Sequence, residues 1–163
     1  KEIGQIEKIK AHKTGQLHRA VSIFIFNHKK ELLLQKRALN KYHSPGLWTN
    51  TVCTHPKPGE TIEEAAIRRL YEEMGIKDTQ IFKIFEFIYK EDLNNGLIEH
   101  EYDHVFIGFS DALPIPNPEE VCDFKYINLE NILEQVKKYP QDYTVWFKLI
   151  INRVISEVQN LTF

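Results

Sequence analysis

Apolar positions along the chain follow two different periods, and each period marks a different kind of element. The segments RAVSIFIF (19–26) and ELLLQKRA (31–38) are apolar runs separated by the polar residues NHKK. Runs of this length joined by a short polar connection predict a β-hairpin. Further strands are expected at TNTVCTH (49–55), IFKIFEFIY (81–89), LIEHEYDHVFIGF (97–109) and around FKYINL (124–129).

Helical spacing is clearest in the middle of the chain. Thr61 can cap a helix there, Glu64 completes a capping box, apolar residues recur at helical spacing as far as Met74, and Gly75 ends the pattern. Together the elements predict an α+β fold in which a sheet packs against helices. Two later helices are expected at LENILEQVKK (129–138) and at the amphipathic DYTVWFKLIINRVISEV (142–158).

Length and composition limit what the chain can be. With 163 residues, no internal repeat and no low-complexity linker, it fits a single domain over residues 1–163, and the proline-rich LPIPNPEE (113–120) is expected to be a loop. Its 21 basic and 23 acidic residues are dispersed, which argues against a nucleic-acid partner. The apolar runs are too short to cross a bilayer. Two separated cysteines favour a reducing compartment, so we expect a cytoplasmic protein.

Alternation along the strands groups the candidate chemical residues. Residues two apart on a strand share a face, so Cys53 and His55 should point the same way, as should Glu99 and Glu101. The opposite face of the second strand would carry His100, Tyr102 and His104, which we expect to lie outside a site built on the glutamates.

Metal ligands are a possible use of the remaining histidines. His28 and His43 are expected to be ordinary residues, whereas His12 and His18 in AHKTGQLH and His55 beside the cysteine are candidates. Three imidazoles and two carboxylates would suit Mg²⁺, Mn²⁺ or Zn²⁺ with one coordination position open. Histidines and glutamates also occur in many inert domains, so spacing alone leaves both readings open.

The expected central helix carries an unusual group of charges. In GETIEEAAIRRLYEEMGI (59–76), Arg68, Glu72 and Glu73 precede a helix-ending Gly-Ile pair, which gives the pattern R-x-x-x-E-E-x-G-apolar. This pattern resembles the second half of the Nudix box, whose carboxylates hold the metal of a diphosphate substrate. Arg69 stands where that box has a glutamate, and an arginine can hold phosphate oxygens instead. We therefore expect diphosphate binding without hydrolysis.

Four segments together resemble the type I isopentenyl-diphosphate isomerases. They are RALNKYHSPGLWTNTVCTHPKPGET (37–61), the altered box, IEHEYDHVF (98–106) and VWF (145–147), and the resemblance runs from about Lys8 to Trp146. It implies a Nudix-like mixed sheet packed between helices. It also implies an isomerase of isoprenoid biosynthesis that interconverts isopentenyl and dimethylallyl diphosphate. The expected partner is thus a small-molecule substrate, isopentenyl diphosphate, and we expect the protein to be a monomer.

The same resemblance implies a role for individual residues. Cys53 matches the reactive cysteine, Tyr89 the tyrosine that assists the acid, Trp146 the aromatic lid residue, and Glu73 the ligand of a Mg²⁺ carried by the substrate diphosphate. The metal ligands match His12, His18, His55, Glu99 and Glu101. The diphosphate-binding residues match Lys8, Arg37, Lys41 and Arg69.

Moving a double bond requires a proton to be added at one carbon and removed from another. A metal-bound glutamate, expected to be Glu101, could add it with help from Tyr89. Cys53 could remove the other proton as a thiolate, if nearby cations lower its pKa from roughly 8.5. The face of Trp146 could stabilise the carbocation-like intermediate by ~2 kcal/mol in a dry site.

Two alternative functions share parts of this pattern. A Nudix hydrolase of a nucleoside diphosphate derivative would use the same helix and phosphate site, but Arg69 and Cys53 argue against it. A Nudix-fold binding module without activity would be expected to have lost several of the assigned residues, all of which are present.

Overall fold

The computed structural model describes residues 3–161 and contains one mixed sheet between helices. In the described part of the chain, strands run in the order β3-β2-β1-β6-β5, with β4 paired to β1 and β7 to β2. The central strands β1 and β6 are parallel, and the other pairs are antiparallel. The strands are β1 (His18–Phe26), β2 (Leu32–Arg37), β3 (Trp48–Thr49), β4 (Val52–Thr54), β5 (Ile81–Asp92), β6 (Ile98–Phe109) and β7 (Val121–Ile127).

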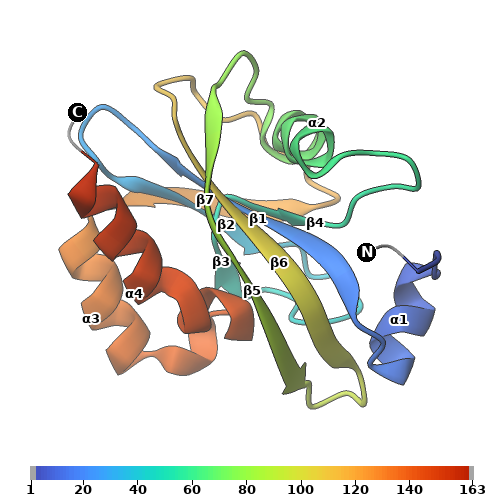
Figure 1. Cartoon of the computed structure of the whole chain (residues 1–163). Helices are drawn as coiled ribbons and strands as arrows, with labels where there is room; N and C mark the ends of the chain where they lie inside the picture. Colours follow the sequence, from blue (N-terminus) through green and yellow to red (C-terminus); the bar gives the residue numbers. More distant parts are fainter. Residues whose placement is uncertain (1–2, 162–163) are drawn as a thin grey trace.

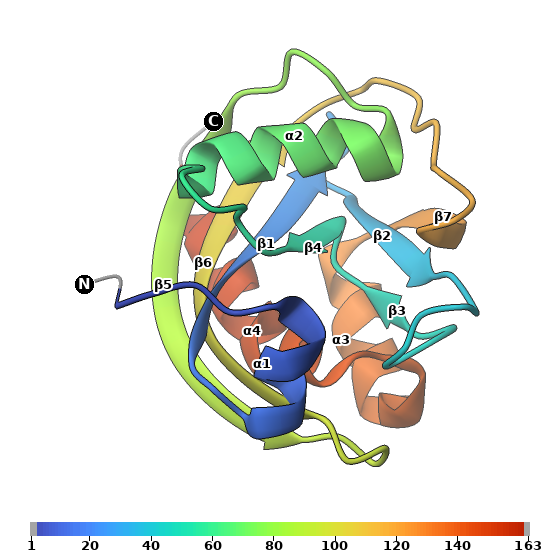
Figure 2. The same ribbon diagram turned by 90° about the vertical axis from the view of Figure 1, so that its right-hand side faces the viewer.

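Helices cover both faces of this sheet. In Figure 1, α3 and α4 lie on one side of the strands and α2 on the other. Figure 2 shows the short α1 near the strand ends. No helix among residues 3–161 is long and apolar enough to span a membrane. The helices are α1 (Lys8–Thr14), α2 (Ile62–Met74), α3 (Leu129–Lys138) and α4 (Val145–Asn160), with a 3₁₀ turn at Pro140–Asp142.

Strand β1 builds a separate core on each face. Phe24 and Phe26 pack with Phe147 of α4, whereas Ile23 and Ile25 belong to the cluster with Leu70 of α2. A strand that is covered on both faces is apolar at consecutive positions, which explains the continuous run in RAVSIFIF. The sheet is thereby fixed between two helical layers, and its strand ends are left to build a site.

The expected central helix is confirmed with its caps. Thr61 Oγ1 accepts a hydrogen bond from the Glu64 amide at 3.1 Å, and the Glu64 carboxylate accepts one from the Thr61 amide at 2.8 Å. Gly75 ends the helix with φ of 68°, in the left-handed region that glycine tolerates best. The predicted α+β class, with a mixed sheet packed between helices, is therefore correct.

Two local predictions differ from the structure, and one helix was not predicted. In place of one strand at residues 49–55 there are two short ones, β3 and β4, because Asn50 and Thr51 turn inward between them and bond neighbouring backbone. The last helix begins at Val145, three residues later than expected, after the 3₁₀ turn. Helix α1 was not predicted, because seven residues carry too little periodicity, and Glu7 caps it through the amides of the next turn.

Candidate active site

A cavity of about 280 Å³ opens between α1, α2, α4 and the ends of the central strands. All but three of the residues assigned from the sequence line it directly; the three are His12, His18 and Tyr89, which contact its glutamates. Its lining includes Lys8, Arg37, Lys41, Cys53, His55, Arg69, Glu73, Glu99, Glu101 and Trp146.

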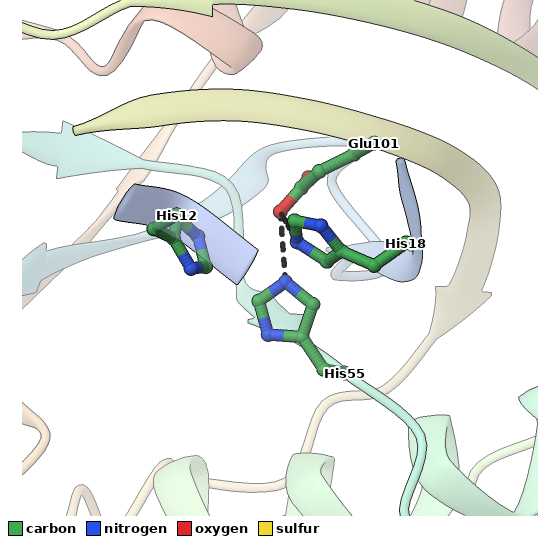
Figure 3. Close-up of side chains that lie close together, drawn as sticks. All are labelled: His12, His18, His55 and Glu101. Carbon is green, nitrogen blue, oxygen red and sulfur yellow. Dashed lines mark hydrogen bonds and ion pairs between the residues drawn. The ribbon is translucent and has the colours of Figure 1, made fainter. Parts of the chain in front are cut away.

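Three histidines converge on Glu101 (Figure 3). His18 is its direct neighbour in the parallel β1–β6 pairing, with Nε2 3.5 Å from Oε1 of Glu101. His55, just after β4, places Nε2 2.8 Å from the same oxygen. His12 arrives from α1, and one ligand atom from each of the four residues lies within 4.8 Å of the others. Strand pairing and the position of α1, rather than the sequence spacing, therefore bring these residues together.

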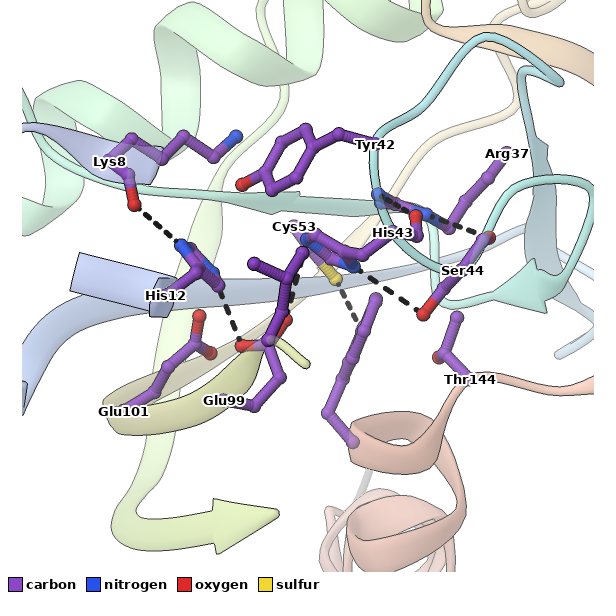
Figure 4. Close-up of polar contacts among 12 residues, drawn as sticks. Lys8, His12, Arg37, Tyr42, His43, Ser44, Cys53, Glu99, Glu101 and Thr144 are labelled. Atoms are coloured by element: carbon purple, nitrogen blue, oxygen red, sulfur yellow. Dashed lines mark hydrogen bonds and ion pairs between the residues drawn. The ribbon is translucent and has the colours of Figure 1, made fainter. Parts of the chain in front are cut away.

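Glu99 forms the second half of the cluster. Its Oε2 is 3.6 Å from Nε2 of His12, and its Oε1 is 3.4 Å from Nε2 of His43 (Figure 4). His43, expected from the sequence to be an ordinary residue, lines the cavity beside Glu99. Its ring is buried, stacks on His12 and meets Trp146 edge-on. His43 stands two residues before a loop proline and belongs to no recognisable motif, so no sequence pattern marked it as a site residue.

The hydrogen bonds around the cluster suit a cation. His12 and His18 each donate Nδ1–H to a backbone carbonyl, that of Lys8 at 2.7 Å and that of Gln16 at 2.8 Å. Each Nε2 then carries a lone pair, which cannot donate to a carboxylate. Both of these buried nitrogens, and Oε2 of Glu99, have no hydrogen-bond partner. Histidines tied in this way to a carbonyl are typical metal ligands, so the side chains present fit a divalent cation.

Electrostatics in the cluster point the same way. Burial, followed by the charge of Glu101, raises the pKa of Glu99 to about 7. Burial also acts on Glu101, but the nearby imidazoles of His18 and His55 outweigh it and hold the Glu101 pKa well below its usual value. Two carboxylates two residues apart thus share a buried space, and a positive charge between the imidazoles would relieve their repulsion.

Cys53 lies in a defined hydrogen-bond chain. Trp146 Nε1 donates to Sγ of Cys53 at 2.9 Å, and the thiol donates to Oδ1 of Asn50 at 3.1 Å. The Asn50 amide nitrogen donates to the carbonyl oxygens of Val52 at 2.8 Å and Ile23 at 3.2 Å, which fixes Oδ1 toward the thiol. Sequence reasoning missed Asn50, because nothing in TNTVCTH distinguishes a buried amide from a loop residue.

The Cys53 pKa differs from the sequence prediction. Burial first, and then the charge of Asp103, raise it to about 12, and the nearby Arg37 charge opposes them only in part. The expected lowering by cations is therefore wrong for the substrate-free protein, in which Cys53 is a thiol. Asp103 is fully buried, continues the face of Glu99 and Glu101, and accepts a hydrogen bond from Ser22 at 2.7 Å. The alternation that selected the two glutamates could also have found it.

Tyr89 stands opposite Glu101 in the antiparallel β5–β6 pairing. Its hydroxyl donates to Oε2 of Glu101 at 2.7 Å. Burial, followed by the charge of Glu101, raises the Tyr89 pKa well above its usual value, so this hydroxyl keeps its proton. The pair therefore presents a protonated phenol and a carboxylate as one unit.

Basic side chains gather at the other end of the cavity. Arg37 donates to the carbonyl oxygens of His43 at 3.1 Å and Ser44 at 3.2 Å, and its guanidinium lies 5.3 Å from the Trp146 ring centroid. The pKa of Lys8 is lowered by burial and then by the charges of Lys41, Arg37 and Arg69. Four cations that repel one another in this way form a site for an anion.

Glu73 lies buried beside these cations. Gln35 Nε2 donates to its carboxylate at 2.8 Å and to the Thr51 carbonyl oxygen at 2.7 Å, and Arg69 forms an ion pair with the other carboxylate oxygen. Gln35 was not identified from the sequence, because it occupies an apolar strand without a motif. It holds Glu73 toward the cavity, where a carboxylate could meet a phosphate-bound cation.

His100, Tyr102 and His104 lie outside the cavity, as expected from the strand alternation. His100 bonds the Gly15 carbonyl oxygen, His104 and Tyr102 contact Glu86, and the exposed His28 contacts Asp111. Arg68 does line the cavity, but its guanidinium is paired with Glu60 and Glu72. Cys122 is an exposed free thiol.

Comparison with known proteins identifies relatives over almost the whole chain. Residues 16–148 match the NUDIX domain family. An isopentenyl-diphosphate Delta-isomerase 2 from Photorhabdus laumondii is 55% identical over 150 residues, which cover 92% of this chain and 84% of the relative. An isopentenyl-diphosphate Delta-isomerase 2 from Aromatoleum aromaticum is 48% identical over 155 residues, which cover 95% of this chain and 82% of the relative.

The fold has relatives at greater distance. A crystal structure from Deinococcus radiodurans superposes with a TM-score of 0.71 at 22% identity and covers 83% of this chain and 82% of that chain. At this identity the likeness extends to the fold alone. Because the sequence matches are close and nearly complete, the chain belongs to the isopentenyl-diphosphate Delta-isomerase family and has a Nudix fold.

Proposed function

We propose that the protein interconverts isopentenyl diphosphate and dimethylallyl diphosphate, within isoprenoid biosynthesis. One observation carries the proposal: a single cavity holds Cys53, Glu101 and a basic end suited to a diphosphate, and Tyr89 bonds Glu101 from behind the cavity lining. The names of its relatives support the same substrate. We also propose a monomeric, cytoplasmic protein.

The Glu101–Tyr89 pair is assigned to one side of the alkene. Glu101 is a carboxylate in the substrate-free protein, so it must take up a proton when the substrate is bound. In the direction that forms dimethylallyl diphosphate, it then delivers that proton to the terminal carbon, and the hydroxyl of Tyr89 stabilises the carboxylate that remains. The divalent cation that His12, His18, His55, Glu99 and Glu101 would hold supplies positive charge, which strengthens Glu101 as an acid. We propose Mg²⁺, Mn²⁺ or Zn²⁺ for this position.

Cys53 is assigned to the other proton. In the forward direction it must accept a proton as a thiolate, and in the reverse direction it donates that proton as a thiol. The substrate-free protein holds the thiol. Donation from Trp146 Nε1 to Sγ and the charge of Arg37 both favour the thiolate, so these two residues support the forward direction. Asn50 accepts from the thiol and so supports the reverse direction.

The carbocation-like intermediate requires protection from water. Trp146, near the start of α4, is 4% exposed and belongs to the large hydrophobic cluster that α4 forms with the sheet. Its indole face could stabilise the intermediate by ~2 kcal/mol. In this proposal the indole N–H of Trp146 bonds Cys53, and the face of the same ring keeps water away from the reacting carbons.

The diphosphate is assigned to Lys8, Arg37, Lys41 and Arg69, with Glu73 at the Mg²⁺ that the diphosphate carries. The charge of the diphosphate does not change in the reaction, so these residues bind substrate and transition state alike. The alternative, a Nudix hydrolase, is opposed by Arg69, because it occupies Glu73 and stands where a further carboxylate would be needed.

Product analysis tests the proposal. The protein is incubated with isopentenyl diphosphate and Mg²⁺, and the products are separated and assayed for phosphate. We expect dimethylallyl diphosphate without released phosphate. Released phosphate would identify a hydrolase, and an unchanged substrate that nevertheless binds would identify a binding module.

A further inference from the structure

Glu120 lies in the cavity, but neither the sequence motifs nor the proposed chemistry uses it. It is the last residue of LPIPNPEE, directly before β7. Its Oε2 forms an ion pair with Nζ of Lys41, and its Oε1 is 3.3 Å from Nη2 of Arg69. One carboxylate thus bridges two of the four cations that are assigned to the substrate diphosphate.

The backbone around Glu120 is fixed from both sides. Its carbonyl oxygen accepts a hydrogen bond from the Ala38 amide at 3.0 Å, which joins it to the end of β2. The amide of Asn117, at the start of the same turn, donates to the Glu73 carbonyl oxygen at 2.9 Å, which joins the turn to α2. The side chain can therefore leave Lys41 and Arg69 by rotation alone, without movement of the loop.

Glu73 also contacts Arg69, but it is placed differently. Its side chain is 6% exposed and is held by Gln35, whereas the Glu120 side chain is 22% exposed and is bonded only to the two cations among the described residues. A buried, anchored carboxylate stays in place when an anion arrives. A partly exposed carboxylate can rotate away from its cations into the solvent. Glu120, rather than Glu73, is therefore the carboxylate that an anion can displace.

We propose that Glu120 is an internal counter-ion that occupies the diphosphate position in the substrate-free protein and is displaced by the substrate. The inference rests on the proposed function, because it uses the diphosphate site assigned there. Without an anion, the cations repel one another: burial first, and then the charges of Lys41, Arg37 and Arg69, lower the pKa of Lys8. A carboxylate between Lys41 and Arg69 reduces this repulsion, and it also competes with the phosphate oxygens that need the same donors.

The competition sets the direction of the expected effect. Glu120→Gln keeps the size of the side chain but removes its charge. Diphosphate then no longer has to replace two ion pairs, so its Kd should fall by roughly three- to tenfold. A residue that merely supported Lys41 and Arg69 would have the opposite effect, because its loss would leave both donors less ordered and weaken binding.

Calorimetric titration with inorganic pyrophosphate and Mg²⁺ tests the proposal on the full chain. Glu119→Gln is the matched control, because the neighbouring Glu119 loses the same charge but is exposed and does not line the cavity. We expect tighter binding in Glu120→Gln and parental binding in Glu119→Gln. Kinetics with isopentenyl diphosphate should show a lower KM in Glu120→Gln with kcat at or below the parental value.

The outcomes separate this inference from the proposed function. Parental protein that binds pyrophosphate, together with equal or weaker binding by Glu120→Gln, would overturn the counter-ion while the diphosphate site stands. No binding by any of the three proteins would overturn the diphosphate site and the counter-ion together. Thermal melting gives a second readout: the rise in Tm on adding pyrophosphate should be larger for Glu120→Gln than for the parent.

Discussion

The indole N–H of Trp146 donates a hydrogen bond to the sulfur of Cys53 across 2.9 Å. A donor at this distance stabilises a thiolate more than a thiol, because hydrogen bonds to charged groups are worth about 1.5–3 kcal/mol against about 1 kcal/mol for neutral pairs. The contact connects α4 with β4 and gives Trp146 a second role besides its ring face.

Trp146→Phe separates these two roles, because it keeps an aromatic face and removes the N–H. We expect kcat to fall by roughly tenfold, from the loss of one hydrogen bond to a charged group, while KM changes little. Steady-state kinetics measure both. Trp48→Phe is the control, since Trp48 does not line the cavity. A parental kcat in Trp146→Phe would show that the N–H has no part in the reaction.

Removal of one histidine tests the metal cluster. His55→Ala loses the nitrogen that lies 2.8 Å from Glu101, so we expect metal content after dialysis and isomerisation both to fall to background. Metal is measured by elemental analysis of the purified protein. His28→Ala, a change on the exposed surface, should keep full metal content. Full occupancy in His55→Ala would contradict the ligand assignment.

Arg37 is expected to act through substrate binding. Arg37→Ala should raise KM by tenfold or more and lower kcat less, because the diphosphate charge is the same before and after the reaction. Some loss of kcat is also expected, since Arg37 holds the loop carbonyls of His43 and Ser44 near the cavity. Lys36→Ala is the neighbouring control, because Lys36 lies over Trp48 instead. An unchanged KM in Arg37→Ala would exclude a diphosphate contact there.

The raised pKa of Cys53 predicts its reactivity. Thiolate is the reactive form, and with a pKa of about 12 only on the order of one Cys53 in ten thousand is a thiolate at pH 8. Iodoacetamide should therefore label the exposed Cys122 first, and labelling of Cys53 should increase with pH up to about 12. Peptide mass spectrometry of each thiol against pH measures this. Rapid labelling of Cys53 at pH 7 would contradict a raised thiol pKa.

The sequence predicted the helices and strands better than it predicted which site residues lie close together. Capping residues and Gly75 defined α2, because those signals are local. The approach of His18 to Glu101 depends on parallel pairing between strands eighty residues apart, which no local pattern encodes. Resemblance to a family supplied that information. His43, Asn50 and Glu120 had no motif, so only their positions in the fold reveal their contacts.

The lowered pKa predicted for Cys53 failed for a physical reason. The prediction counted cations near the thiol, and Arg37 does act in that direction. It did not include the cost of burial or the charge of Asp103, and both depend on tertiary packing. In the proposed reaction, the Cys53 thiolate would therefore form only after the substrate has bound.

Isomerisation in D₂O tests the central claim, that Glu101 with Tyr89 adds one proton and Cys53 removes the other. Parental protein and Cys53→Ala are incubated with isopentenyl diphosphate and Mg²⁺, after their fold and metal content have been shown to agree, and dimethylallyl diphosphate is followed by NMR. The account predicts deuterium in a product methyl group for the parent and no turnover for Cys53→Ala. Turnover by Cys53→Ala within about threefold of the parent would contradict it, because a buried thiol that only fills space costs some stability and leaves the rate intact.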